Sequence, residues 1–253
     1  MRLFCALMCA VLVAPVSSAT ASRAVAPEYV ALGDSYSSGT GAGSYTSLLC
    51  RRSANAYPAL LAASRPGGEF KFVACSGATV RDVVAKQLAA LDAGTTLVTV
   101  GVGGNDAGFV STMLACRFGT VDRCRTALEK GREFVEDELP ARLDSLYAQI
   151  RRRAPRAEVV VVGYPHLYRE GGRCPGGLGS AKRTMINEAV DVMAGVLADR
   201  AAAAGFAFAD ARPAFAGHEI CAADAWIGAD SVHPTAEGQA RGYLPAVTAA
   251  VDS

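Results

Sequence analysis

Five short apolar runs, rich in β-branched residues, constrain the fold of this chain more than any other feature of its sequence. Their apolar residues are nearly continuous rather than alternating, as expected for strands buried on both faces of a parallel sheet. The stretches between and after them have apolar residues at helical spacing or are rich in alanine. The alternation predicts an α/β fold with a five-stranded parallel sheet and right-handed crossovers. The runs are residues 28–32, 70–74, 95–100, 158–162 and 206–209, and the helical stretches are residues 80–91, 126–153 (bent or restarted at Pro140), 180–204 and 236–251.

The first 21 residues have the features of a secretory signal peptide. Arg2 supplies a positive charge, residues 3–16 are apolar, and an Ala-x-Ala cleavage site ends at Ala21. The apolar stretch is short for a bilayer span, and no later segment is long and apolar enough to be one. An uncleaved membrane anchor is the competing interpretation. We predict a signal peptide over residues 1–21, a single domain over residues 22–253, and a secreted protein with no stable membrane span.

The composition excludes several classes of protein. Hydrophobic residues make up 51% of the chain and charged residues 19%, which excludes a largely disordered protein. The formal net charge of +1 does not indicate a nucleic-acid partner. The three histidines are scattered and no Cys-x-x-Cys occurs, so we expect no metal, and nothing in the sequence requires a cofactor. We expect a monomer.

The cysteines agree with export. Cys5 and Cys9 would leave with the signal peptide, so six of the eight cysteines remain. An even number of cysteines in an exported chain indicates disulfides rather than free thiols. The sequence alone leaves their pairing open, and sequential pairing is the simplest possibility because Cys116 and Cys124 would close a short loop.

Residues suited to a functional site follow the ends of the predicted strands. Ser35 follows the first strand, Gly77 the second, Asn105 the third and Tyr164 the fourth. Ligands of such sheets bind beyond the carboxyl ends of the strands. We therefore expect these four residues to gather at one edge of the sheet.

Ser35 and His233 are the candidate nucleophile and base. Ser35 follows Gly33 and Asp34 in a strand-to-turn context, although such residues also occur in ordinary turns. A serine hydroxyl becomes a good nucleophile only when a base accepts its proton. His233 can be that base, and Asp230 lies three residues before it, where its carboxylate can orient the imidazole. The other two histidines, His166 and His218, are expected to be structural.

Three groups are candidate donors to an oxyanion. They are the backbone N–H groups of Ser35 and Gly77 and the side-chain amide of Asn105. One alternative is that Asn105 merely caps a helix after its strand. Another is a dinucleotide-binding loop, because Gly101 and Gly103 follow a strand, but the Gly-x-Gly-x-x-Gly spacing is absent.

Four short blocks, taken in order, resemble those of the SGNH, or GDSL, hydrolases. The resemblance covers residues 29–238 and implies a three-layer α/β/α, flavodoxin-like fold. It also implies that Ser35 is the nucleophile, that His233 is the base, and that the oxyanion hole consists of Ser35 N–H, Gly77 N–H and the Asn105 side chain. The blocks are Gly33-Asp34-Ser35, Gly77, Gly103-Gly104-Asn105-Asp106 and Asp230-x-x-His233-Pro234-Thr235.

Within that family the chain looks most like the compact secreted bacterial lipases, esterases and phospholipases. The resemblance to those enzymes implies three sequential disulfides, Cys50–Cys75, Cys116–Cys124 and Cys174–Cys221. The chain departs from the family pattern in having Tyr36, where the GDSL block has leucine, after Ser35. In some relatives a backbone carbonyl orients the histidine, so either Asp230 or the carbonyl of Ser231 is the third member here.

The sequence therefore predicts a secreted serine esterase or lipase, with a phospholipase of type A as one form of it, that hydrolyses acyl esters through an acyl-enzyme on Ser35. The predicted partner is an ester of a lipid or a small alcohol. Apolar residues near the strand-end loops, among them Phe109 and Met113, weakly favour lipid acyl groups, although packing beneath the loops explains them equally well. The alternatives are a polysaccharide O-acetyl esterase and a non-catalytic binding domain.

Overall fold

The computed structural model describes residues 28–253 except 176, 229 and 231. A five-stranded parallel sheet lies at its centre, with strand order β4-β1-β5-β6-β7. In chain order of these five strands this is 2-1-3-4-5, the flavodoxin-like doubly wound order, which confirms the predicted fold class. The strands are β1 (Glu28–Gly33), β4 (Glu69–Phe72), β5 (Leu97–Gly101), β6 (Glu158–Val162) and β7 (Ala207–Ala209). The predicted signal peptide, residues 1–21, lies outside the described residues.

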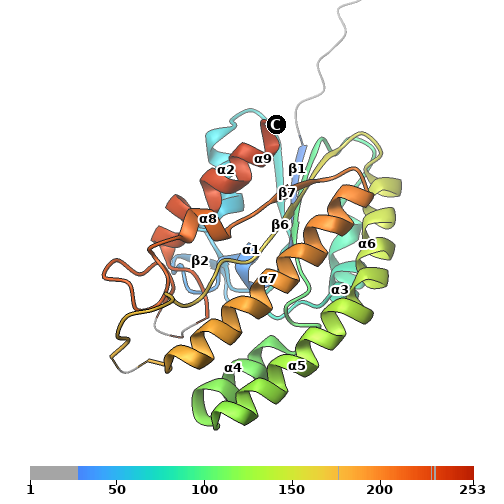
Figure 1. Cartoon of the computed structure of the whole chain (residues 1–253). Coiled ribbons are helices and arrows are strands. Elements are labelled where there is room, and N and C mark those ends of the chain that lie inside the picture. The colour runs from blue at the N-terminus through green and yellow to red at the C-terminus, as the bar shows by residue number, and fades with distance from the viewer. Residues whose placement is uncertain (1–27, 176, 229, 231) are drawn as a thin grey trace, which may run out of the picture.

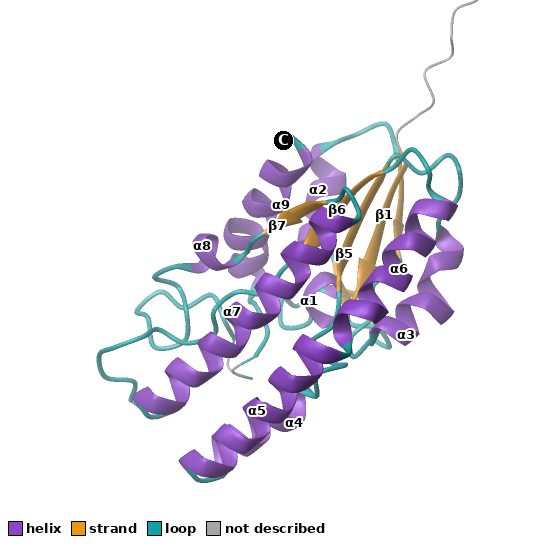
Figure 2. Cartoon of the chain, turned by 45° about the vertical axis from the view of Figure 1, so that its right-hand side comes forward, coloured by secondary structure: helices purple, strands orange, loops and turns teal. Residues whose placement is uncertain are grey.

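Helices cover both faces of the sheet and make three layers (Figures 1 and 2). One face is covered by α2 (Tyr57–Ser64) and α9 (Leu244–Val251), and the other by α3 (Val80–Asp82), α6 (Leu139–Arg153) and α7 (Ser180–Ala203). The middle strand, β5, is buried along its whole length. Its continuous apolar sequence is therefore explained by burial on both sides. The remaining helices are α1 (Ser35–Ser38), α4 (Phe109–Phe118), α5 (Val121–Asp137) and α8 (Arg212–Phe215), and a small hairpin is formed by β2 (Tyr45–Ser47) and β3 (Arg52–Ser53).

Several elements differ from the sequence-based expectations. Helix α4 and the β2–β3 hairpin are not predicted, and the helix expected over residues 80–91 consists of α3, a π-helical turn (Val83–Gln87) and a 3₁₀ turn (Leu88–Ala90). The strand expected over residues 70–74 is β4, which ends at Phe72. The N–H groups of the next two residues both donate to Ala31 O, so the chain leaves the hydrogen-bond ladder there. The break near Pro140 is confirmed: α5 ends at Asp137 and α6 begins at Leu139. A second π-helical turn (Gly238–Tyr243) leads into α9.

Three disulfides join Cys50 to Cys75, Cys116 to Cys124 and Cys174 to Cys221, the pairing that the resemblance implies. The first ties the β2–β3 hairpin to the segment after β4. The second joins α4 to α5. None of the helices that the structure describes is both long and apolar enough to span a membrane.

Candidate active site

Ser35 is the first residue of α1 and follows the end of β1 directly after Asp34. The turn requires Gly33, whose φ is +133° and where a Cβ would collide with the carbonyl oxygen of Gly101. The buried side chain of Gln87 accepts a hydrogen bond from Gly33 N–H (2.8 Å) and donates one to Gly33 O (2.9 Å). Gln87 therefore binds both the N–H and the carbonyl oxygen of Gly33 and holds the backbone that leads into Ser35.

His233 reaches Ser35 from the loop before the last helical segment. Its Nε2 lies 2.9 Å from Ser35 Oγ, although 198 residues separate the two in the sequence. Pro234 follows His233 and disfavours helical dihedrals for it, so the side chain is presented from a loop. A neutral imidazole at this distance can accept the hydroxyl proton.

Asp230 contacts the other ring nitrogen of His233. Its Oδ2 lies 2.6 Å from His233 Nδ1, and its Oδ1 accepts hydrogen bonds from the N–H groups of Val232 (3.0 Å) and His233 (2.9 Å). Partial burial would raise the pKa of the Asp230 carboxyl, but the hydrogen bonds from the His233 side chain and from the backbone outweigh it and lower the pKa to about 2. An ionised carboxylate at Nδ1 leaves Nε2 as the acceptor. The alternative group, the Ser231 carbonyl, lies outside the described residues.

The three candidate oxyanion donors are the N–H groups of Ser35 and Gly77 and the side-chain amide of Asn105. Within the part of the chain that the structure describes, neither the N–H of Ser35 nor that of Gly77 donates a backbone hydrogen bond. The Asn105 amide donates to Ala78 O (3.0 Å), which leaves its nitrogen a second hydrogen. Cys75 N–H donates to Gly33 O (3.0 Å), so the segment that leads to Gly77 runs beside the start of the Ser35 turn.

Tyr164, expected at the end of the fourth strand, links Asp34 in the Ser35 turn to Gly104 in the segment before Asn105. Its hydroxyl donates to Asp34 Oδ2 (2.6 Å) and accepts from Gly104 N–H (3.1 Å), the residue before Asn105. Burial raises the pKa of Asp34 to about 6, although the hydrogen bonds from Tyr164 and from Tyr36 N–H act to lower it. The predicted strand-end residues are therefore brought to one edge of the sheet.

A cavity of about 790 Å³, a volume that includes space open to solvent, begins at Ser35 and extends between α4, α5 and α7. Lys182 of α7 donates to the carbonyl oxygens of Cys116 (2.7 Å) and Gly119 (2.7 Å), so it ties α7 to the end of α4. The lining is mostly apolar and includes Phe109, Met113, Leu128, Val135, Ile186, Ala189, Val190 and Met193.

A model of the GDSL-like lipase/acylhydrolase family matches residues 31–241. The chain belongs to this family. Membership identifies it as a carboxylic ester hydrolase, so the relationship expected from the four sequence blocks is confirmed.

Several Streptomyces enzymes are similar to this family member over most of its length. The chain is 49% identical to a lipase from Streptomyces rimosus over 242 residues, which cover 92% of this chain and 90% of the relative. The crystal structure of a phospholipase A1 from Streptomyces albidoflavus NA297 superposes with a TM-score of 0.87 at 49% identity, covering 89% of this chain and 99% of that one. The crystal structure of an extracellular lipase from Streptomyces rimosus also gives a TM-score of 0.87, at 50% identity, and covers 89% of this chain and 100% of that one.

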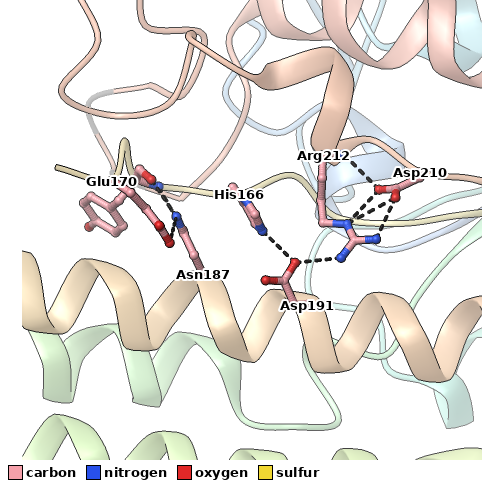
Figure 3. Close-up of polar contacts among 7 residues, drawn as sticks. His166, Glu170, Asn187, Asp191, Asp210 and Arg212 are labelled. Atoms are coloured by element: carbon pink, nitrogen blue, oxygen red, sulfur yellow. Dashed lines mark hydrogen bonds and ion pairs between the residues drawn. The ribbon is translucent and has the colours of Figure 1, made fainter.

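The other two histidines of this acylhydrolase have partners away from Ser35. His166 Nε2 lies 2.7 Å from Asp191 Oδ1, and the same oxygen accepts from Arg212 (2.6 Å), as Figure 3 shows. This network joins the loop after β6 to α7 and α8. His218 stacks on Trp226 with ring centroids 3.5 Å apart. Both contacts agree with the structural roles expected for these histidines.

Tyr36 contacts the loop that carries His233, a contact that the sequence does not predict. Its buried ring lies 5.6 Å from the His233 ring, and its hydroxyl donates to Val232 O. The only sequence signal was the tyrosine in place of leucine after Ser35. The amide of Gln239 donates to Tyr36 O (3.0 Å) and accepts from Tyr57 N–H (2.9 Å), so α1 is also held from the C-terminal segment.

Proposed function

We propose that this enzyme is a secreted lipase that hydrolyses carboxylic esters of lipids through an acyl-enzyme on Ser35. The observation that carries the proposal is the chain of contacts from Asp230 through His233 to Ser35, with distances of 2.6 Å and 2.9 Å. This is the arrangement that general-base activation of a serine requires.

In the proposed first step, Ser35 Oγ attacks the ester carbonyl carbon while its proton passes to His233 Nε2. Asp230, ionised at neutral pH, stabilises the imidazolium that forms. The electron pair of the carbonyl moves onto its oxygen, which the N–H groups of Ser35 and Gly77 and the second amide hydrogen of Asn105 stabilise. Each such donor contributes about 10²–10³-fold to kcat.

The intermediate then collapses, and the leaving alkoxide takes the proton from His233. The acyl group remains bonded to Ser35 Oγ. In the second half of the reaction, water gives a proton to His233, attacks the acyl carbon and releases the acid. Ser35 recovers its proton from His233, so the reaction consumes one water for each ester. None of these steps involves a metal or a cofactor.

The apolar cavity favours lipid esters over acetylated polysaccharides. It starts at Ser35 and continues between α4, α5 and α7, where an acyl chain would be buried among apolar side chains. Burial of each methylene contributes up to about 0.8 kcal/mol to binding, a gain that an acetyl group does not provide. The names of the relatives, a lipase and a phospholipase A1, point to the same class of substrate.

The remaining parts of the proposal concern the context of the enzyme. The three disulfides and the description of a relative as extracellular support export. We further propose that residues 22–253 form a single domain that acts as a monomer on an ester substrate, without a nucleic-acid partner.

A fluorophosphonate probe tests the proposal directly, because it reacts with an activated serine hydroxyl. We expect the label on Ser35, and we expect Ser35→Ala to lose both the label and the hydrolysis of nitrophenyl esters. Ser37→Ala is the matched control, since the Ser37 hydroxyl lies 3.1 Å from that of Tyr57, and it should keep the label. Labelling or hydrolysis by Ser35→Ala at the parent level would exclude Ser35 as the nucleophile.

A further inference from the structure

The large apolar side chains that this enzyme exposes are confined to two short segments. Across residues 28–253, leaving aside 176, 229 and 231, the exposed side chains are Leu48 and Leu49 between β2 and β3, and Val110, Leu114, Phe118 and Val121 along α4 and at the start of α5. Leu49 is 91% exposed and Phe118 77%. Grouped apolar side chains on a protein surface indicate an interaction site.

Helix α4 has apolar side chains on two opposite faces. Val110, Leu114 and Phe118 are four residues apart, so they form one stripe along the outside of the helix. Phe109 and Met113 lie on the inner side and line the cavity that begins at Ser35. The helix is therefore a thin wall between that cavity and an exposed apolar stripe.

The first exposed segment is linked to the residues around Gly77, and the second begins five residues after Asn105. Cys50, directly after Leu49, is bonded to Cys75, and its carbonyl oxygen accepts from Ser76 N–H (3.0 Å). On the α4 side, the Asn105 amide donates to Ala78 O. Figure 2 shows α4 and α5 extending beyond the carboxyl ends of the strands, at the edge where α1 lies. The two apolar segments thus flank the candidate active site.

These segments are also basic. Residues 44–53 and 109–125 contain five arginines, at positions 51, 52, 117, 123 and 125, and a single acidic residue, Asp122. Asp122 forms an ion pair with Arg125 at 2.7 Å. Because the whole chain has a formal net charge of only +1, positive charge is concentrated beside the exposed apolar residues.

We propose that Leu48, Leu49 and the outer stripe of α4 (Val110, Leu114, Phe118) form a docking surface for an anionic phospholipid bilayer. The apolar side chains enter the boundary between headgroups and acyl chains, and the arginines approach the lipid phosphates. A second copy of the chain fits this surface less well, because two faces of the same positive charge repel each other. The role of the surface rests on the proposed hydrolysis of lipid esters, but its binding is measurable without catalysis.

Vesicle binding by the Ser35→Ala enzyme separates docking from hydrolysis. We expect it to bind vesicles that contain phosphatidylcholine and phosphatidylglycerol, and to bind phosphatidylcholine vesicles weakly. The triple substitution Val110→Ser/Leu114→Ser/Phe118→Ser should weaken binding at least about tenfold, since buried apolar area drives interfacial binding. Phe118→Ser alone is the second variant, and it should act in the same direction if the triple variant does not fold.

The contribution of the β2–β3 hairpin to vesicle binding is tested separately, again in the Ser35→Ala enzyme. Leu48→Ser/Leu49→Ser should also weaken binding to the anionic vesicles several-fold. These side chains are largely exposed, so urea unfolding of this variant should match that of the parent.

The contribution of the arginines to vesicle binding is tested with two double variants, one in the proposed docking surface and one at the opposite edge of the sheet. Arg51→Gln/Arg123→Gln should weaken binding to anionic vesicles roughly 25-fold, because each arginine near such a surface contributes about fivefold. Arg152 and Arg153 are also exposed, but they lie in the last turn of α6, just before the start of β6. Arg152→Gln/Arg153→Gln should therefore leave vesicle binding unchanged.

With Ser35 intact, the surface variants should keep the parent kcat/KM on a soluble short-chain ester and lose activity on vesicles in proportion to binding. Parent-level vesicle binding by both apolar variants would overturn the docking surface. The docking surface would also be overturned if Arg152→Gln/Arg153→Gln lost as much vesicle binding as Arg51→Gln/Arg123→Gln. The same holds if sedimentation velocity showed a parent dimer that the apolar variants convert to a monomer. A parent that hydrolyses no ester would instead contradict the proposed function and leave the binding results intact.

Discussion

The hydroxyl of Tyr36 donates a 2.7 Å hydrogen bond to the carbonyl oxygen of Val232, the residue before His233. Tyr36 directly follows Ser35, so this bond joins the turn of the proposed nucleophile to the loop of the proposed base across 196 residues of sequence. A leucine at this position has no group that can make the contact. The tyrosine is therefore a candidate for positioning His233 relative to Ser35.

Tyr36→Phe removes only that hydroxyl. A hydrogen bond contributes about 0.5–1.5 kcal/mol, so we expect kcat to fall roughly 2- to 10-fold with little change in KM. Tyr243→Phe is the control, since it removes a buried hydroxyl that donates to Gly163 O rather than to the histidine loop. It should lower the urea midpoint without lowering kcat. If Tyr36→Phe behaves in the same way, the hydroxyl has a structural role only.

Asp230→Asn tests which group orients His233. The carboxylate contacts His233 Nδ1 at 2.6 Å, and its loss should lower kcat by about 10⁴, as for other triad aspartates. Steady-state kinetics on a soluble nitrophenyl ester measure the effect. Retention of most of the activity would instead favour a Ser35–His233 dyad oriented by the Ser231 carbonyl.

Asp34 should make the protein less stable as the pH rises from about 4 to about 7. Its pKa is 3.8 ordinarily and about 6 when buried in the fold. The folded protein therefore binds more protons than the unfolded chain between these values. The stabilising contribution is complete below the lower pKa and is lost as the pH rises through the higher one. Two pKa units correspond to about 3 kcal/mol.

Asp34→Asn removes this titration, whereas the other groups titrate in both proteins. The free energy of unfolding of the variant minus that of the parent should therefore increase with pH over this range. Urea unfolding at several pH values measures it. A difference that is constant with pH would mean that Asp34 does not titrate in the folded protein.

Ala189→Leu should shorten the acyl chain that the enzyme prefers. Ala189 lies on the part of α7 that lines the cavity, and a larger side chain there occupies space next to the substrate chain. Displacement of about two methylenes should lower kcat/KM for long-chain nitrophenyl esters roughly tenfold and leave acetyl and butyryl esters unaffected. Ala203→Leu, at the exposed end of α7, is the matched control. Equal loss at every chain length would place the acyl group elsewhere.

The parts of the fold that the sequence predicted well are those with local signals. The buried strands have continuous apolar runs, and the residues after them reach one edge because parallel strands share a direction. Helix α4 was missed because Val110 and Phe118 on its outside, with Met113 on its inside, give it no amphipathic pattern.

The contacts that complete the site were not predictable for a different reason. Tyr36 to Val232 and Tyr164 to Asp34 join residues more than a hundred positions apart. The sequence marked Tyr36 only as a departure from leucine and Tyr164 only as a residue at a strand end, and neither signal indicates the partner of the hydroxyl. The geometry at Asp230 likewise depends on the loop conformation, which places its two oxygens on the backbone and on Nδ1 at once.

The links at the outer end of the cavity have a consequence for how a substrate enters. The Cys116–Cys124 bond joins α4 to α5, and Lys182 ties α7 to the same region. These links hold the cavity walls at one spacing. In the proposed reaction an acyl chain would enter a slot close to its final shape, so little of the binding free energy would go into ordering the protein.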